Sequence, residues 1–282
     1  MDCTRCEKKE ASSIFSRSFV CIFAVNRNKN IMKHIGIVFA ITLALCLASC
    51  SKSDNLRVMS YNVHHCRGID NKIDYKRIAD VINRVSPDFV ALQELDSATT
   101  RNNGKVCIEE LARETGMHAS YASAIYFGGG SYGIGILSKE KPIKTAVVPL
   151  ASRGEARRLL IAEYDKYIVC CTHFALNADD RLASAQIVCD AVKQYKKPLL
   201  FAGDMNCVAA DPEQAVIGSL FTTLNNPDEC TYPSINANEC IDYIYAMNNG
   251  YSYNVSESRV LVGDSIESDH LPLYVDVQIS KK

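Results

Sequence analysis

The sequence predicts an α/β protein in which short strands build sheets and helices form layers outside them. Short apolar segments dominate the chain after residue 57, and several alternate in character as half-buried strands do. Apolar residues at helical spacing lie between some of these segments. We therefore expect helices packed on the outer faces of the sheets. No internal repeat, long linker or low-complexity tract interrupts the pattern.

The clearest strand candidates are apolar runs of four to six residues, a usual length for a strand. They are Val58–Val63, Phe89–Leu92, Gly133–Leu137, Leu159–Glu163, Ile168–Thr172, Leu199–Ala202, Ile241–Ala246 and Leu273–Val277. The strands between residues 132 and 173 follow one another directly along the chain. This order favours antiparallel meanders in that region.

Three helices are predicted from apolar spacing and end signals. The first carries Ile78, Val81, Ile82 and Val85, with Asp74 available as its N-cap and Pro87 closing the segment. A second helix is marked by Leu182, Ala185, Val188, Cys189 and Val192, and a third surrounds Leu111.

The first 50 residues of the 282 are expected to lie outside the folded domain. Met32 and Lys33 precede an apolar run, Ile35–Leu47, which ends in Ala48-Ser49-Cys50. A short positive region, an apolar stretch and small residues form a secretory signal. The run is shorter than the ~20 apolar residues that span a bilayer, which argues against a transmembrane helix. Cys50 resembles the lipidated cysteine of a bacterial lipobox.

Residues 32–50 are therefore expected to be a lipoprotein signal peptide, with lipidated Cys50 holding the protein on a bacterial membrane in the cell envelope. Residues 1–31 lack periodicity and are interpreted as an extension that is not natively translated. Residues 51–282 fit a single domain with a sizeable core. They carry 24 basic and 29 acidic residues, a net charge of −5. A negative net charge does not favour binding of duplex DNA, because such binding normally uses clustered lysine and arginine residues.

Cysteine usage leaves two interpretations open. Eight cysteines follow Cys50, and export would permit disulfides between them. Cys170 and Cys171, however, are adjacent in a predicted strand and point to opposite faces. Reduced cysteines that act as small core residues are the alternative. Cys230 and Cys240 flank a loop and are the first pair to test.

Polar and acidic residues gather where the predicted strands begin or end. They are Asn62, Glu94, His173, Asp204, Asn206, Asp242, Asp269 and His270. Functional groups often collect where strands stop and loops begin. Carboxylates held together repel one another unless a cation or bound protons balance their charge. The pattern therefore indicates a site for a divalent metal ion.

Six short motifs in this order resemble the endonuclease/exonuclease/phosphatase superfamily. They are Tyr61-Asn62-Val63, Leu92-Gln93-Glu94, Thr172-His173, Gly203-Asp204-Met205-Asn206, Ile241-Asp242-Tyr243-Ile244 and Ser268-Asp269-His270. One short motif alone would be weak evidence, but six in the right order are specific. The resemblance covers essentially all of residues 55–279. It implies a four-layer αββα sandwich of two mixed, largely antiparallel sheets with outer helices.

The resemblance also assigns roles around the metal ion. Glu94 resembles the main metal-binding glutamate, and Asn62 an asparagine that helps to position metal and phosphate. Asp269 resembles a further ligand of the metal or of its water. Because carboxylates suit hard cations, the expected cofactor is Mg²⁺, or Mn²⁺ in its place.

The catalytic roles follow in the same way. Asp204 and Asn206 resemble the pair that orients the attacking water and binds phosphate oxygens. His270 resembles the histidine that acts on the water or phosphoryl group, with Asp242 as its carboxylate partner. His173 resembles the second histidine, which contacts the scissile phosphate and stabilises or protonates the departing oxygen.

Several further assignments are looser. Glu155 could pair with His173, or it could be an ordinary surface glutamate. Arg101 is a candidate for binding the substrate phosphate, since guanidinium groups suit phosphate oxygens, although a solvated loop arginine is an equal alternative. His64 and His65 could line the cleft. Relatives commonly carry arginine where this chain has Cys240, which leaves the type of substrate open.

We thus expect a metal-dependent hydrolase of phosphoester bonds, monomeric and lipid-anchored, with in-line attack by water. The expected substrate is a phospholipid headgroup or a small phosphorylated metabolite. Two alternatives stay open: a secreted nuclease acting on DNA or RNA, and a binding module that kept the fold but lost catalysis.

Overall fold

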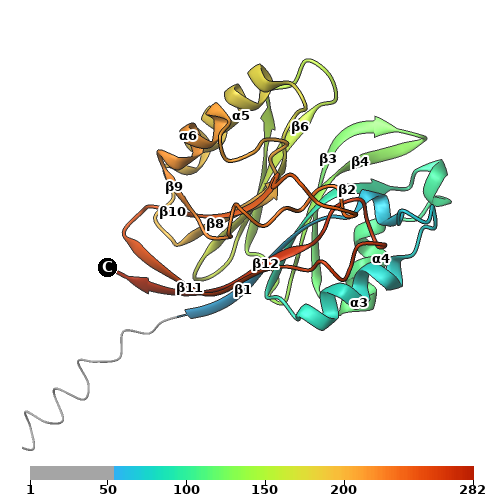
Figure 1. Cartoon of the computed structure of the whole chain (residues 1–282), viewed down its shortest axis with the longest axis horizontal. Helices are drawn as coiled ribbons and strands as arrows, with labels where there is room; N and C mark the ends of the chain where they lie inside the picture. The colour runs from blue at the N-terminus through green and yellow to red at the C-terminus, as the bar shows by residue number, and fades with distance from the viewer. Residues whose placement is uncertain (1–53) are drawn as a thin grey trace, which may run out of the picture. The chain divides into compact units, whose positions relative to one another are not determined.

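Two six-stranded β-sheets pack face to face in the computed structural model, which describes residues 54–282 (Figure 1). The extension predicted at residues 1–31, the signal peptide at 32–50 and lipidated Cys50 lie outside the described residues. Within the described part of the chain, no helix is both long and apolar enough to cross a membrane.

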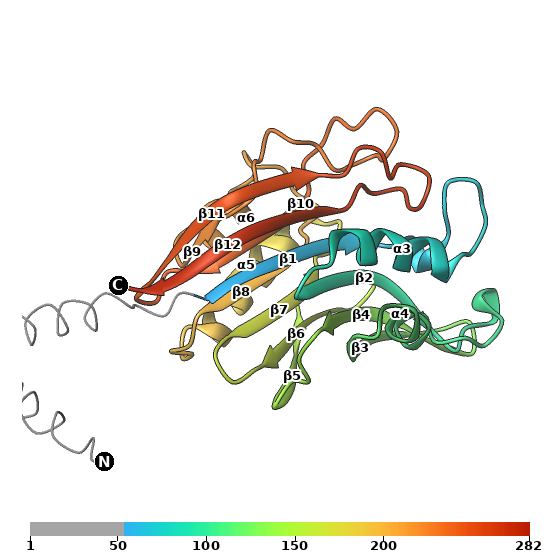
Figure 2. The same cartoon turned by 90° about the horizontal axis from the view of Figure 1, so that it is seen from below.

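The first sheet is mixed: β1 and β2 run parallel, and the other neighbouring strands run antiparallel. Figure 2 shows its strands side by side. In spatial order they are β11 (Tyr251–Val260), β12 (Leu273–Lys281), β1 (Asp54–Asn62), β2 (Phe89–Ser97), β4 (Gly130–Ser138) and β3 (His118–Phe127).

The second sheet is also mixed, with β7 and β8 as its one parallel pair. In spatial order its strands are β5 (Lys144–Leu150), β6 (Arg157–Glu163), β7 (Ile168–His173), β8 (Leu199–Asp204), β10 (Asp242–Met247) and β9 (Phe221–Thr223). The prediction of consecutive antiparallel strands holds for β6 and β7, and β5, which the sequence did not predict, joins the same run. It is wrong for β4, which belongs to the first sheet and forms a hairpin with β3.

Helices cover the outer face of each sheet (Figure 1). The first sheet carries α3 (Tyr75–Val85) and α4 (Cys107–Thr115), and the second carries α5 (Ala178–Val192) and α6 (Pro212–Gly218). Two short 3₁₀ turns, η2 (His64–Cys66) and η3 (Thr100–Asn102), lie beyond the ends of β1 and β2. These layers confirm the predicted αββα sandwich.

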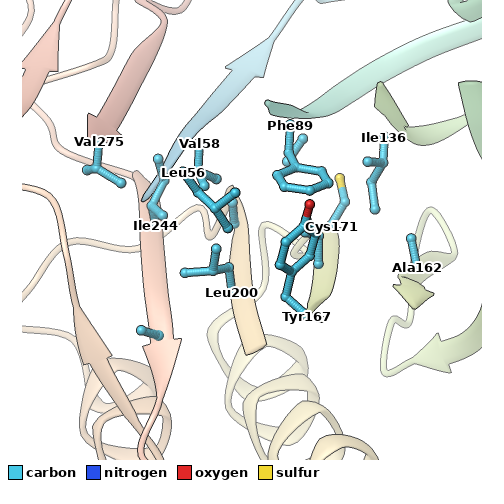
Figure 3. Close-up of a cluster of buried hydrophobic side chains, with 14 of the residues drawn as sticks. Leu56, Val58, Phe89, Ile136, Ala162, Tyr167, Cys171, Leu200, Ile244 and Val275 are labelled. Atoms are coloured by element: carbon cyan, nitrogen blue, oxygen red, sulfur yellow. The ribbon is translucent and has the colours of Figure 1, made fainter. Parts of the chain in front are cut away.

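Three apolar cores hold the layers together. The central core lies between the sheets, where the Phe89 ring packs 5.0 Å from the Tyr167 ring (Figure 3). The Phe89 ring also lies 4.9 Å from the Tyr164 ring. A second core joins α5 and α6 to the second sheet, and a third joins α3 and α4 to the first sheet. Burial of these faces fixes the register of the strands, since a slip of one residue would exchange the side chains of the central core with those that face the helices.

Local signals place the start of the first helix as the sequence predicted. The Asp74 carboxylate accepts a hydrogen bond from the Arg77 backbone N–H at 3.0 Å, which caps α3. The helix ends at Ser86 in a left-handed conformation, just before Pro87. The second predicted helix is α5, whose cap is the side chain of Asn177.

The cysteines act as core residues rather than cross-links. All eight cysteines of the described residues are free thiols, Cys230 and Cys240 among them. Seven are buried, and burial raises the pKa of the Cys240 thiol to about 12. The expectation of small reduced core residues is therefore the one that the structure matches.

Candidate active site

Adjacent strands of the second sheet bring three predicted site residues to one level. His173 ends β7 and pairs with Asp204, which ends β8. Asp204 in turn pairs with Asp242, the first residue of β10. Gly203 allows the close approach of β7 and β8, since a Cβ there would lie 2.2 Å from the Thr172 carbonyl oxygen.

The first sheet contributes Asn62 and Glu94 from its parallel pair. Asn62 is the last residue of β1 and pairs with Gln93 of β2. The register of β2 against β4 shifts between Leu92 and Leu95, and Glu94 within this bulge has a φ of 62°. Bulges re-aim side chains, and this one turns the Glu94 carboxylate toward Asn62.

A single carboxylate oxygen is the centre of the site. Asp204 Oδ2 accepts a hydrogen bond from Asn62 Nδ2 at 3.0 Å, and it lies 3.5 Å from His173 Nε2 and 3.6 Å from His270 Nε2. The same Asn62 nitrogen donates to Glu94 Oε1 at 3.1 Å. One amide thus joins the two sheets and holds two carboxylates together.

The loop before β12 delivers His270 and Asp269. Ser268 Oγ donates to the Asn62 carbonyl oxygen at 2.7 Å, which ties this loop to the end of β1. His270 Nδ1 lies 2.9 Å from Asp242 Oδ2. The Asp269 side chain remains partly exposed and accepts a bond from Ser268 Oγ at 3.3 Å.

Burial and neighbouring charge set the protonation of Asp204 and His270. Burial, together with the negative charge of Asp242, raises the pKa of Asp204 to about 7. Burial disfavours the charged imidazole of His270, but Asp242 and Asp204 outweigh that effect and raise its pKa to about 10. His270 is therefore an imidazolium at neutral pH, with Asp242 fixing its orientation.

His173 has the opposite character. Burial, followed by the positive charges of Arg157 and His270, lowers the pKa of His173 well below its ordinary value. Arg157 NH1 lies 3.5 Å from His173 Nδ1, and because the guanidinium can only donate, Nδ1 is the acceptor and Nε2 carries the hydrogen. The looser prediction that Glu155 pairs with His173 is wrong: Glu155 binds Arg157 instead, because the guanidinium stands between them.

Arg101 is held by a buried carboxylate. Its guanidinium donates to both oxygens of Asp96, at 2.6 and 2.7 Å, and lies over the ring of Phe127. Arg101 nevertheless borders a cavity of about 140 Å³ that Glu94 also lines. The contact with substrate phosphate that the sequence suggested remains a prediction.

The remaining candidates take supporting positions. Asn206 donates from its backbone N–H to Asp204 Oδ1 at 2.9 Å, and its side-chain amide donates to the Phe174 carbonyl oxygen. Asn206 adopts a φ of 49° in the sharp turn after β8. His64 lines the cavity, with its Nδ1 3.9 Å from Asp269 Oδ1.

Sequence reasoning missed three residues of this region. Arg157 lies against His173, and the Tyr232 ring packs 4.7 Å from the His270 ring. Tyr132 lines the cavity, and burial, with Glu94 beside it, raises the pKa of its hydroxyl. Nothing in a single sequence shows that the rings of Tyr132 and Tyr232 face the site.

The residues present fit a divalent cation. Glu94, Asp204, Asp242 and Asp269 bring four carboxylates to the region, and Asp242 Oδ1 is buried without a hydrogen-bond partner. Burial, together with the negative charge of Asp242, raises the pKa of Asp204, so the ionised carboxylate lacks a compensating charge. Carboxylate and amide oxygens are ligands for Mg²⁺ and Mn²⁺, so such an ion would supply that charge.

Comparison with known proteins agrees with this geometry. The sequence profile of the Endonuclease/Exonuclease/phosphatase family matches residues 59–270. An endonuclease/exonuclease/phosphatase structure from Beutenbergia cavernae is 22% identical, covers 80% of this chain and 72% of its own, and has a TM-score of 0.68. One from Bacteroides vulgatus is 17% identical, covers 79% of this chain and 98% of its own, and has a TM-score of 0.66.

A mannosyl-6-phosphatase from Bacteroides thetaiotaomicron has the same fold, with 16% identity, coverage of 79% of this chain and 99% of its own, and a TM-score of 0.62. The chain belongs to the Endonuclease/Exonuclease/phosphatase family, whose members are hydrolases of phosphoester bonds.

Proposed function

We propose that this protein hydrolyses the phosphoester bond of a small phosphorylated molecule with the help of a divalent cation. The main support for this proposal is the environment of Asp204 Oδ2. This oxygen lies 3.0 to 3.6 Å from Asn62 Nδ2, His173 Nε2 and His270 Nε2. The arrangement combines a proton acceptor, a fixed cation and a neutral hydrogen-bond donor around one point. In-line attack by water, with inversion at phosphorus and no covalent intermediate, needs these three functions.

Asp204 is the candidate general base. A group works best in proton transfer when its pKa lies near the working pH, and the pKa of Asp204 is about 7. Its other oxygen is held by the Asn206 backbone N–H, so Oδ2 is the atom that accepts the proton of water. Asn62 fixes the direction of that oxygen.

His270 is the candidate phosphate-binding cation. With its pKa at about 10, the ring carries a proton on both nitrogens and donates Nδ1–H to Asp242. Nε2–H is then available to a phosphate oxygen, where its charge stabilises the transition state. Asp242 prevents the ring from turning away, and Tyr232 packs against its face.

His173 is the candidate donor to the leaving oxygen. The ring is neutral, with hydrogen on Nε2, so it supplies a hydrogen bond rather than a full positive charge. This modifies the sequence-based expectation that His173 protonates the leaving group. Arg157 holds the ring in that tautomer.

Glu94, with Asn62 and Asp269 near it, would hold the cation, which supplies charge neutralisation at the phosphate when bound. The resemblance implies Mg²⁺ or Mn²⁺, and carboxylate oxygens are suitable ligands for both ions. The full set of acids and imidazoles argues against an inactive binding module, since binding alone needs neither both histidines nor every carboxylate.

The cavity beside Glu94 supports a small substrate. The cavity measures about 140 Å³. Its lining includes the aromatic rings of Phe127 and Tyr132 and the polar side chains of His64 and Glu155. Rings and polar groups together suit a phosphorylated sugar or similar polyol, and one structural relative is a mannosyl-6-phosphatase. A phospholipid headgroup is the second candidate, because we also propose anchoring through Cys50 in the cell envelope. Nucleic acid is less favoured by the acidic charge of the domain.

A substrate panel tests the proposal. Hexose 6-phosphates, phospholipid vesicles and plasmid DNA are each assayed with Mg²⁺ or Mn²⁺ and again with chelator. We expect metal-dependent release of phosphate from a small ester, and Glu94→Gln should remove it while the melting temperature stays within a few degrees. Turnover that survives both the chelator and Glu94→Gln would refute the assignment.

A further inference from the structure

His64, His65 and Glu94 form a group whose possible ligand atoms lie within 4.8 Å of one another. All three line the cavity of about 140 Å³. Two ligands on opposite sides of an ion with bonds of about 2.2 Å lie roughly 4.4 Å apart, so only a small movement would bring the three atoms onto one ion.

The backbone takes an unusual path to place these rings. His64, His65 and Cys66 have φ values of 44°, 47° and 61°, all in the left-handed region. Residues other than glycine rarely adopt this region, and three in succession are rarer still. The turn is held by hydrogen bonds from Cys66 N–H to the Val63 carbonyl oxygen and from Arg67 N–H to the His64 carbonyl oxygen.

The imidazoles have nitrogen atoms without partners. His65 is 3% exposed, and its Nδ1 is buried with no hydrogen bond. His64 Nδ1 is also buried, and its nearest acidic oxygen, Asp269 Oδ1, lies beyond hydrogen-bond distance at 3.9 Å. Buried polar atoms in folded proteins nearly always have a partner, so two such atoms beside a carboxylate point to a ligand.

The local charges permit a cation at this position. Arg101 is the nearest guanidinium in the cavity wall, but both Asp96 oxygens engage it. Glu94 shares only one of its oxygens with the amide of Asn62. The negative charge of Glu94, with that of Asp269 beyond His64, therefore remains available to an ion.

We propose that His64 and His65 are nitrogen ligands of the cation that Glu94 holds. The inference rests on the proposed metal-dependent function and narrows it. Mg²⁺ takes oxygen ligands, whereas imidazole favours first-row transition metals. A site with two imidazoles and one carboxylate therefore binds Mn²⁺ or a later transition-metal ion in preference to Mg²⁺.

Pulsed electron paramagnetic resonance of the full chain with one equivalent of Mn²⁺ tests this directly, because ¹⁴N bonded to the ion modulates the echo. We expect nitrogen modulation in the native protein, weaker modulation in His64→Gln and in His65→Gln, and loss in the double variant. Calorimetry should show that the double variant loses at least about tenfold in Mn²⁺ affinity, while Mg²⁺ affinity changes little. His118→Gln is the matched control, because His118 is exposed at the start of β3 and should change nothing.

Two results separate this inference from the proposed function. If Mn²⁺ binds through Glu94 and supports hydrolysis, but the double variant keeps the same nitrogen modulation, the imidazole ligands are refuted and the proposed function stands. If neither Mn²⁺ nor Mg²⁺ binds the native chain, both proposals fail. Thermal unfolding of each variant checks that the fold is retained, and single variants that fold keep the test open if the double variant does not.

Discussion

Replacing Asp242 with asparagine removes one charge from the site with almost no change in shape. Asp242 Oδ2 lies 2.9 Å from His270 Nδ1, and both side chains are buried. The rise in the pKa of His270 from 6.5 to about 10 corresponds to about 5 kcal/mol in favour of the charged ring. Burial opposes this charge, so Asp242 and Asp204 together supply more than that amount.

In Asp242→Asn we expect the pKa of His270 to fall toward or below 6.5, because burial remains and the stronger of the two carboxylates is gone. At pH 7.5 the ring would be neutral and would no longer stabilise a phosphate oxygen with its positive charge. The expected fall in kcat is about 10²- to 10⁴-fold. NMR titration of the imidazole resonances measures the pKa of His270. The fall in kcat is measured on the ester of the panel that is hydrolysed best.

Asp276→Asn is the matched control, since it removes a carboxylate that pairs with Arg57 and not with the site. It should lower stability but leave kcat within about twofold. The reasoning is refuted if Asp242→Asn leaves the pKa of His270 near 10, or if both variants lose the same activity.

Three further predictions concern the surroundings of the site. Arg157→Met should raise the pKa of His173, because the Arg157 charge helps to depress it, and NMR titration of the His173 ring measures the change. Arg101→Ala should lower the free energy of unfolding, measured in urea, by about 2 kcal/mol. The substitution leaves Asp96 buried without its ion pair, and the loss stays moderate because Arg101 is partly exposed. In metal-free protein the high pKa of Asp204 means that the folded state keeps a proton which the unfolded chain loses above pH 4. The contribution of Asp204 to stability should therefore fall from about pH 4 to 7, and added Mn²⁺ should raise the melting temperature more at pH 8 than at pH 5.

The controls for these predictions use pairs outside the site. Arg84→Ala removes an exposed guanidinium whose partner is Asp264 and should cost no more than about 0.5 kcal/mol. Equal losses for the Arg84 and Arg101 variants would contradict the importance of the buried partner. An unchanged His173 titration in Arg157→Met, or equal gains from Mn²⁺ at the two pH values, would contradict the electrostatic account.

The interior of the fold could be predicted from the sequence because buried strands carry continuous apolar runs. The eight predicted strands correspond to β1, β2, β4, β6, β7, β8, β10 and β12. The four missed strands, β3, β5, β9 and β11, are the edge strands of the two sheets. Edge strands bury less surface, and nearly all positions of β3 and β11 are exposed or only partly buried, so their apolar signal is weak.

The strand-end residues of the site could be predicted because each motif is short and local. Asn62, Asp204 and Asp242 lie where strands start or stop, and the motifs mark those points. Side-chain pairings between neighbouring segments could not be predicted in the same way. The link from Arg157 to His173 depends on the β6–β7 register, and the binding of Arg101 to Asp96 depends on the turn after β2. The left-handed turn at His64 and His65 also leaves no sequence signal, since neither residue is glycine.

An anomalous-scattering map of crystals soaked in Mn²⁺ tests the central claim most directly, namely that Glu94 holds a divalent cation in this site. We expect a peak at bonding distance from the Glu94 carboxylate, on the side of the cavity that His64 and His65 line. The account is contradicted if the ion binds elsewhere, for example at the group formed by Cys207, Asp211 and Glu213, while Glu94 remains without metal at saturating Mn²⁺.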